Sequence, residues 1–208
     1  MNPTGAKAQT AAWPDGYGRQ VFDSVDSTLS EAARQSSQLA GATWILAQEQ
    51  TAARGRRGRS WATPRGNFAA TLMMRRTEAP STAALRSFVA SLALRRAFVA
   101  TTRDEGAFSL KWPNDVLLNG GKVAGILLES IGDFLAIGIG VNLAHAPGAD
   151  QVEAGALRPV SVVAETGKVV PPEVFLNALA AEYAQLETQF QTYGFAPIRA
   201  AWLTHRSG

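Results

Sequence analysis

The sequence predicts a single α+β domain, in which a mostly antiparallel sheet is backed by helices. The predicted strands come in hairpins, and the predicted helices stand apart from them instead of alternating with single strands. The 208 residues suffice for one domain of ordinary size, and a chain of this length buries about 70% of its unfolded surface. With 46% hydrophobic and 18% charged residues, the composition excludes wholesale disorder.

In the N-terminal half, residues 1–20 are rich in Ala, Gly and Pro without a period, which predicts a flexible arm before the domain. A capping-box pattern, T-L-S-E, then predicts a helix over 28–39. Short apolar runs predict strands over 44–47 and 68–74. The 51–66 stretch between them is a long Arg/Gly loop, and long loops in compact domains are usually functional or disordered.

In the C-terminal half, an apolar stripe predicts a helix over 82–101. The apolar face of another helix, 173–193, ends at Gly194, where a C-terminal capping glycine belongs. Asn119-Gly-Gly between two apolar runs is a strong hairpin signal because Asn and Gly accept positive φ. The remaining predicted elements are strands over 108–112, 116–118, 123–128 and 134–143 and a short last helix over 197–205.

The composition also excludes several kinds of site. The absence of cysteine excludes disulfide scaffolds, thiolate zinc sites, iron–sulfur clusters and cysteine nucleophiles. Two histidines leave little room for a histidine metal site or a Ser-His-Asp triad. No apolar run reaches the ~18 residues of a membrane span, and the N-terminus lacks the apolar core of a secretory signal. We therefore expect a cytoplasmic protein that does not contact membranes.

Positive charge is concentrated in one segment. Residues 50–77 contain seven arginines and no acidic residue, whereas the whole chain has a net charge of only +3. Between Gln50 and Trp61 the arginines alternate with small residues, so the backbone can approach a ligand while several guanidinium groups converge on it. This pattern favours a site for a carboxylate and a polyphosphate. A solvated basic loop and an RNA-binding Arg/Gly tract are the alternatives.

A second segment, residues 111–129, reads KWPNDVLLNGGKVAGILLE. Pro113 ends a strand and exposes Asn114 and Asp115 at its tip, and Lys122 begins the return strand of the hairpin. We therefore expect Asp115 and Lys122 near one site. An amide, a carboxylate and two lysines there can orient a nucleotide, hold a metal and neutralise developing negative charge. An ordinary hairpin with exposed turn charges is the alternative.

A third segment is Gly138-Ile-Gly-Val-Asn142. It lacks the third glycine of the dinucleotide fingerprint and opens no predicted helix, so a dinucleotide-binding fold is not expected. Glycines on a strand instead admit a ligand close to the sheet, and Asn142 can supply amide contacts.

In this order, the three segments resemble those of biotin protein ligases, and the likeness runs over about residues 21–205. The resemblance implies a mixed sheet backed by helices, related to class II aminoacyl-tRNA synthetases. It implies that biotin and MgATP give biotinyl-5′-AMP and pyrophosphate. The adenylate then acylates a lysine of a biotin carboxyl carrier protein domain. The substrates implied are thus ATP and biotin, with Mg²⁺.

The resemblance also assigns roles to individual residues. Lys122, Arg56 and Asp115 are expected to be catalytic, with Asp115 also a magnesium ligand. The residues expected to bind biotin are Ser27, Thr28, Gln50, Arg54, Arg56, Lys122 and Gly125. Those expected to bind ATP are Arg56, Arg57, Arg59, Trp61, Lys111, Asn114 and Asn142. The loop is expected to order only over its ligand, which would shield the labile mixed anhydride from water.

The chain departs from the family pattern at several points. Ala53 stands where the loop usually has its first glycine, which would cost of order 1 kcal/mol if that position needs positive φ. Leu29 replaces the asparagine of the usual Ser-Thr-Asn triplet, so one amide is lost. We expect a catalytic domain over 21–208 with neither the N-terminal winged helix nor the C-terminal β-barrel of some members. DNA binding is therefore not expected, and the resemblance leaves room for a homodimer.

Three other functions stay open at this point. A lipoate ligase or octanoyltransferase shares the fold, although the Arg/Gly loop together with Lys-Trp-Pro-Asn-Asp favours biotin. An RNA-binding module would use Arg54–Arg59 but would need stacking aromatic residues, and none lies between Ala52 and Ser60. A catalytically inactive domain that only binds the carrier is the third.

Overall fold

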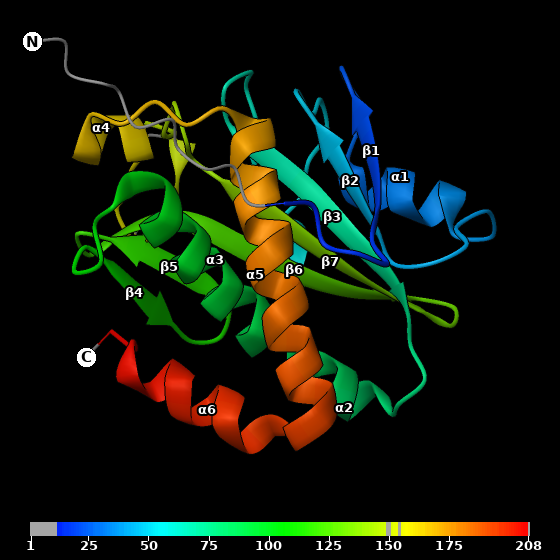
Figure 1. The fold of residues 1–208 in the computed structure, drawn as a ribbon. Coiled ribbons are helices and arrows are strands. Elements are labelled where there is room, and N and C mark those ends of the chain that lie inside the picture. Colours follow the sequence, from blue (N-terminus) through cyan, green and yellow to red (C-terminus); the bar gives the residue numbers. More distant parts are fainter. Residues whose placement is uncertain (1–11, 149–150, 154, 208) are drawn as a thin grey trace, which may run out of the picture.

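The structure, a computed structural model, describes residues 12–148, 151–153 and 155–207. Its strands are β1 (Gly18–Phe22), β2 (Thr43–Ala47), β3 (Phe68–Arg75), β4 (Phe108–Lys111), β5 (Asp115–Leu118), β6 (Gly121–Ile131) and β7 (Phe134–Val141). They form one seven-stranded sheet in the order β1-β2-β3-β7-β6-β5-β4 (Figure 1). The sheet is mixed, because β1 and β2 are parallel and all other neighbours are antiparallel.

The helices divide between the two faces of this sheet. They are α1 (Thr28–Gln35), α2 (Pro80–Ala84), α3 (Arg86–Thr102), α4 (Val162–Thr166), α5 (Pro172–Tyr193) and α6 (Phe195–Thr204). In Figure 1, α3 and α5 lie side by side across the front of the sheet, and the main core is packed between them and the strands. On the opposite face, α1 buries Leu29 and Ala32 against Ile45, Met73 and Ala136.

Strand β7 explains why one face of the sheet is filled and the other is hollow. Successive side chains of a strand point to opposite faces. In the sequence FLAIGIGV, the large residues at alternate positions enter the main core. Ala136, Gly138 and Gly140 lie on the other face, and β6 places Gly125 directly opposite Gly140. The face away from α3 and α5 therefore has a floor of bare backbone.

Most predicted elements are confirmed to within a few residues. The hairpin between β5 and β6 turns at Asn119 and Gly120, whose φ values are 49° and 77°. Gly194, with φ 73°, ends α5 as predicted. The helix predicted over 82–101 is divided at Leu85 into α2 and α3.

Three details of the prediction were wrong. The flexible arm was predicted to extend to residue 20, but β1 begins at Gly18, and Trp13 and Tyr17 pack against the main core. Residues 1–11 of that arm lie outside the described part. The predicted helix over 28–39 ends at Gln35, and α4 was not predicted. Strand β1 escaped detection because it is a largely exposed edge strand without an apolar run. Among the described residues, no helix is long and apolar enough to span a membrane.

A buried ion network joins the helices of the main core. Arg86 of α3 donates to both carboxylate oxygens of Glu187 on α5, with Nη2 2.7 Å from Oε1. Arg86 also pairs with Glu78, and the Tyr183 hydroxyl donates to Glu187 at 3.2 Å. Burial and the nearby Glu187 charge raise the pKa of Tyr17 to about 12. These contacts fix α3 and α5 to each other on the front face of the sheet.

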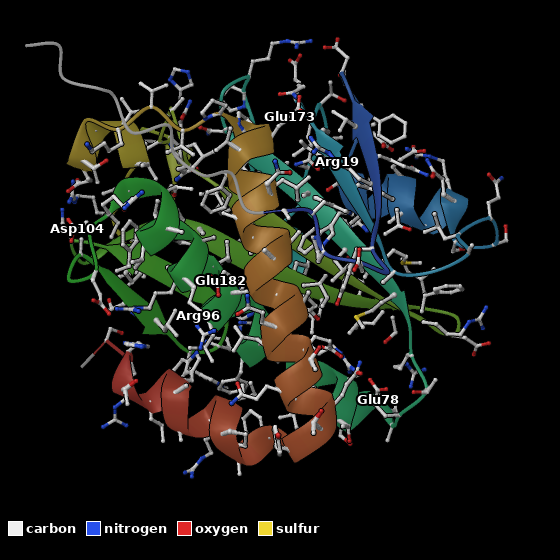
Figure 2. All side chains as sticks on the ribbon, viewed as in Figure 1. Arg19, Glu78, Arg96, Asp104, Glu173 and Glu182 are labelled. Carbon is white, nitrogen blue, oxygen red and sulfur yellow. The ribbon has the colours of Figure 1, made fainter. Side chains whose placement is uncertain are left out.

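We predict that Glu187→Ala lowers the free energy of unfolding by about 3–5 kcal/mol, because it leaves the Arg86 guanidinium buried without its main counter-ion. Urea unfolding followed by circular dichroism measures the change. Glu182→Ala is the matched control: it removes a partly exposed carboxylate that pairs with Arg96 across the same two helices at 3.4 Å (Figure 2). We expect less than about 1 kcal/mol for this control. Equal losses in the two variants would contradict a special role for the buried network.

Candidate active site

A cavity of about 770 Å³ lies over the floor formed by Gly125, Gly138 and Gly140. All three sequence segments singled out above contribute to its lining, as do the first turn of α1 and the segment that follows β7. The structure brings together every residue predicted to be in the site. These are Ser27, Thr28, Gln50, Arg54, Arg56, Arg57, Arg59, Trp61, Lys111, Asn114, Asp115, Lys122, Gly125 and Asn142.

One end of the cavity is formed by the start of α1. Thr28 donates from its backbone N and from Oγ1 to Gln50 Oε1, at 2.7 and 3.1 Å. Gln50 Nε2 in turn donates to Thr63 Oγ1 at 3.0 Å, so the orientation of the Gln50 amide is fixed. Ser27 is the N-cap residue of α1, but its hydroxyl makes no capping hydrogen bond and lines the cavity. This end therefore presents hydroxyl, amide and helix N-terminal donors to a ligand.

Asp26 keeps the start of α1 in place. Its Oδ1 accepts from the Ser27 backbone N at 2.7 Å, and both of its oxygens accept from Arg34. Hydrogen bonding from Arg34, reinforced by that from Ser27, lowers the pKa of Asp26 to about 2. The carboxylate therefore stays ionised at physiological pH.

Sequence reasoning missed one polar residue beneath this end. Thr71 of β3 is completely buried, and its Oγ1 donates to Thr28 Oγ1 at 2.9 Å. Its signal in the sequence was a lone hydroxyl in the otherwise apolar run FAATLMMR. Buried polar groups of this kind are costly unless they are hydrogen-bonded, and here the partner is a residue of the site.

The Arg/Gly loop folds back on itself as a short irregular hairpin. Gly55 N donates to Arg59 O at 2.7 Å, and Trp61 N donates to Ala53 O at 3.0 Å. The positive φ values at its tip belong to Arg57 (60°) and Gly58 (74°). Ala53 does not have a positive φ, so the strain considered for this departure from the family pattern is absent.

Three of the loop arginines bind side chains from other parts of the chain. Arg54 pairs with Glu129 of β6, Arg56 Nη1 donates to Asn114 Oδ1 at 3.1 Å, and Arg59 pairs with Glu153 at 2.7 Å. These contacts connect the loop to the sheet, to the second segment and to the chain that follows β7. The loop is therefore part of the cavity wall, which argues against a freely solvated basic loop or an RNA-binding tract.

The opposite end of the cavity is built around Lys122. Its Nζ lies 2.7 Å from Asp115 Oδ1, at an angle outside hydrogen-bond geometry, and 5.6 Å from the ring centre of Trp61. The register of β5 and β6 shifts between Val116 and Leu117, and bulges of this kind re-aim side chains. Trp61 lies so close over the floor that a Cβ added at Gly125 would be 3.3 Å from its ring.

The other predicted residues of this end are divided between the wall and the rim. Asn114 is held by a hydrogen bond from its Nδ2 to Ile126 O at 2.8 Å. Asn142 is buried, and Lys111 is exposed at the rim. Lysine, arginine and amide groups thus gather at one end of the cavity, opposite the uncharged donors at the start of α1.

The loss of the asparagine at position 29 has a clear structural counterpart. Leu29 lines the cavity and packs directly on the backbone of Gly138, where an added Cβ would lie 2.8 Å from Leu29 Cδ1. The same side chain belongs to the small core between α1 and the sheet. An apolar contact therefore replaces the amide of the family pattern.

A metal would find few ligands of its own in this cavity. No cluster of three or more His, Asp or Glu residues suitable for a metal exists in the described part of the chain. Two carboxylates line it, and each is paired with a cation: Asp115 with Lys122, and Glu153 with Arg59. Since Mg²⁺ is commonly held by one or two carboxylates together with substrate phosphates, the residues present fit an ion delivered with a nucleotide better than a resident one.

The cavity is thus suited to an elongated ligand that is polar and uncharged at one end and anionic at the other. The sequence model of the biotin/lipoate A/B protein ligase family matches residues 21–143. A biotin–[acetyl-CoA-carboxylase] ligase of Paracoccus denitrificans is 55% identical over 183 residues, which cover 86% of this chain and 76% of that protein. Other curated bacterial ligases match over about half of their own length.

Solved structures agree with the sequence match. A biotin protein ligase from Aquifex aeolicus in complex with biotin and ATP has a TM-score of 0.81 at 25% identity, over 91% of this chain and 78% of that chain. The Leishmania major biotin protein ligase in complex with biotinyl-5-AMP has a TM-score of 0.79 at 27% identity, over 93% and 82%. The fold, the matched segments and the sequence identity agree, and the chain belongs to the biotin/lipoate A/B protein ligase family.

Proposed function

We propose that this chain joins biotin to a lysine of a biotin carboxyl carrier protein, using ATP and passing through biotinyl-5′-AMP. The observation that carries the proposal is that hydroxyl and amide donors at the start of α1 and the cationic Lys122 of β6 line the same cavity. Biotin offers a partner to each, with a ureido ring at one end and a carboxylate at the other. The names of the Paracoccus ligase and of the two solved complexes support the same reaction.

The ureido ring belongs at the α1 end. Its carbonyl oxygen needs donors. The Thr28 amide is already bound to Gln50 Oε1, so the donors left there are the Ser27 hydroxyl, the next amides of the first turn of α1 and the second hydrogen of Gln50 Nε2. The Thr28 hydroxyl and Gln50 Oε1 already bind each other. Thr28 therefore acts mainly by orienting Gln50.

The carboxylate and the α-phosphate of ATP meet at the Lys122 end. A carboxylate oxygen attacks the α-phosphorus, the new C–O–P linkage forms, and pyrophosphate leaves with the electrons of the broken P–O bond. Two anions must approach each other for this step, and Lys122 and Arg56 neutralise the charge that builds on the phosphate. In the second step the carrier lysine amine attacks the acyl carbon and AMP leaves, so no enzyme nucleophile is needed.

We further propose that Asp115 orients Lys122 and that Mg²⁺ enters with ATP. The 2.7 Å ion pair supports this assignment, because a metal on Asp115 would have to displace the lysine ammonium. This proposed orienting role replaces the expectation that Asp115 is itself a magnesium ligand. The carrier domain as partner, a cytoplasmic location, the absence of DNA binding and the homodimer stay predictions.

The proposed function predicts that the purified protein forms biotinyl-5′-AMP from biotin, ATP and Mg²⁺. Thin-layer chromatography with α-labelled ATP detects the product, and a carrier domain with its acceptor lysine tests the second step. Lipoate and octanoate in place of biotin are the controls. An adenylate with lipoate but none with biotin would overturn the proposal in favour of the lipoate branch of the family. Adenylate formation without transfer would restrict it to the first step.

Lys122→Ala should lower the rate of biotin-dependent ATP–pyrophosphate exchange by about 100-fold or more, since loss of one preorganised charge donor typically has this effect. The thermal midpoint should fall as well, because the mostly buried Asp115 carboxylate loses its counter-ion, so the exchange rate is measured below the unfolding range of both proteins. Lys168→Ala, at an exposed position that is not part of the cavity lining, is the control. Unchanged exchange in Lys122→Ala would remove Lys122 from the mechanism while leaving the family assignment intact.

Asp115→Asn distinguishes an orienting role from a metal-binding role. If Asp115 orients Lys122, kcat for adenylate formation should fall about tenfold through misplacement of the ammonium. The Mg²⁺ concentration for half-maximal rate should stay the same. Titration of Mg²⁺ at saturating ATP and biotin measures both quantities. A large increase in the Mg²⁺ requirement would show instead that Asp115 is a metal ligand.

A further inference from the structure

We propose that Glu129 is a positioning residue of the active site, which anchors the Arg/Gly loop to the sheet through Arg54. The inference rests on the proposed function, because it concerns how the loop holds biotin and its adenylate. It changes the expected role of Arg54 from a residue that contacts biotin to one that holds the loop in place.

The contact between the two residues is a two-point ion pair. Arg54 Nε donates to Glu129 Oε1 at 3.3 Å, and Nη2 donates to Glu129 Oε2 at 2.9 Å. The third nitrogen, Nη1, donates to Ser30 Oγ at 3.2 Å. All three nitrogens of the guanidinium are therefore engaged by side chains of the protein. Planar two-point pairs of this kind fix orientation as well as distance.

Strand alternation places Glu129 where the loop can reach it. Gly125, Leu127 and Glu129 alternate along β6 on the face that carries the cavity, whereas Ile126 points into the main core. The residue paired with Glu129 on β7 is Ala136, which lies on the same face of the sheet and packs under α1. The carboxylate thus stands two residues beyond the cavity lining at Leu127, on the same side as the loop.

The anchor acts at the base of the loop hairpin. Arg54 faces Ser60 as a bridge pair, and the flanking hydrogen bond joins Trp61 N to Ala53 O. A shift of Arg54 would therefore move Trp61, which lies on the glycine floor beside Lys122. Through Ser30 the same guanidinium also contacts α1, whose first turn forms the donor end of the cavity. Glu129 therefore couples the loop to both ends of the site without lining it.

The first test is loosening of the loop in Glu129→Gln, which keeps the shape of the side chain but removes its charge. We expect trypsin to cut the ligand-free protein after the exposed Arg57 about threefold to fivefold faster than the wild type, in keeping with a partly exposed ion pair. Glu182→Gln is the matched control. Its carboxylate pairs with Arg96, and the arginine in each pair is 41% exposed, with the glutamates 26% and 30% exposed. We expect wild-type cleavage for the control.

The second test is retention of the adenylate. Glu129→Gln should raise the dissociation rate of biotinyl-5′-AMP and the KM for biotin by about threefold to fivefold, while kcat at saturating substrates stays within twofold. Arg54→Gln should have the same effect, and the double variant should be no worse than either single variant. A merely destabilised protein would instead lose kcat and thermal midpoint together.

A charge exchange separates the anchoring role from direct contact with biotin. If Arg54 acts through Glu129, the Arg54→Glu/Glu129→Arg double variant should retain adenylate better than Arg54→Glu alone. Additive effects of the two Gln variants, no rescue by the exchange, or wild-type trypsin cleavage in Glu129→Gln would each overturn the proposal. The trypsin measurement needs no substrate, so it still tests the anchor if the wild type proves to make no biotinyl adenylate.

Discussion

The site depends on the absence of side chains from one face of two neighbouring strands. The backbone is exposed there at Gly125 of β6 and at Gly138 and Gly140 of β7. The residues that alternate with these glycines along each strand point to the other face and fill the main core. Because a strand alternates between faces, one short sequence can serve a packed core and a ligand floor at once. Trp61 and Leu29 rest directly on this floor, so a Cβ at Gly138 or Gly140 would displace the walls of the cavity as well as its ligand.

Charge in the cavity is organised by pairing. The loop arginines gather with lysine in a small volume, and like charges brought together in this way repel. Each of three carboxylates forms an ion pair with one of these cations. They are Asp115, Glu129 and Glu153, which lie in different parts of the fold. The carboxylates thus let a concentrated positive segment fold against the sheet, because each one neutralises a cation that would otherwise repel its neighbours.

The sequence was sufficient to predict the chemistry-bearing segments and most of the secondary structure. Glycine spacing, the Asn119-Gly120 turn and the alternation in β7 are local patterns, which can be recognised in a single sequence. The ion pairs and hydrogen bonds of the site join residues far apart in the chain, so no local pattern predicts them. Glu129 stood in a recognised segment without a role because its partner Arg54 is 75 residues away. Thr71 was not predicted to belong to the site, because its role depends on its tertiary partner Thr28. The edge strand β1 was not predicted because it has no apolar pattern.

The tip of the loop carries a residue that its backbone does not favour. Arg57 has φ 60° and ψ 26°, a left-handed conformation that glycine adopts freely and that costs other L-residues about 1–2 kcal/mol. The next residue of the turn, Gly58, is already a glycine, so this turn accommodates glycine. Packing does not explain the arginine, because its side chain is exposed. The tip of the loop therefore carries a conformational cost that no packing contact of the Arg57 side chain offsets, so the free energy of folding of the rest of the domain must cover it.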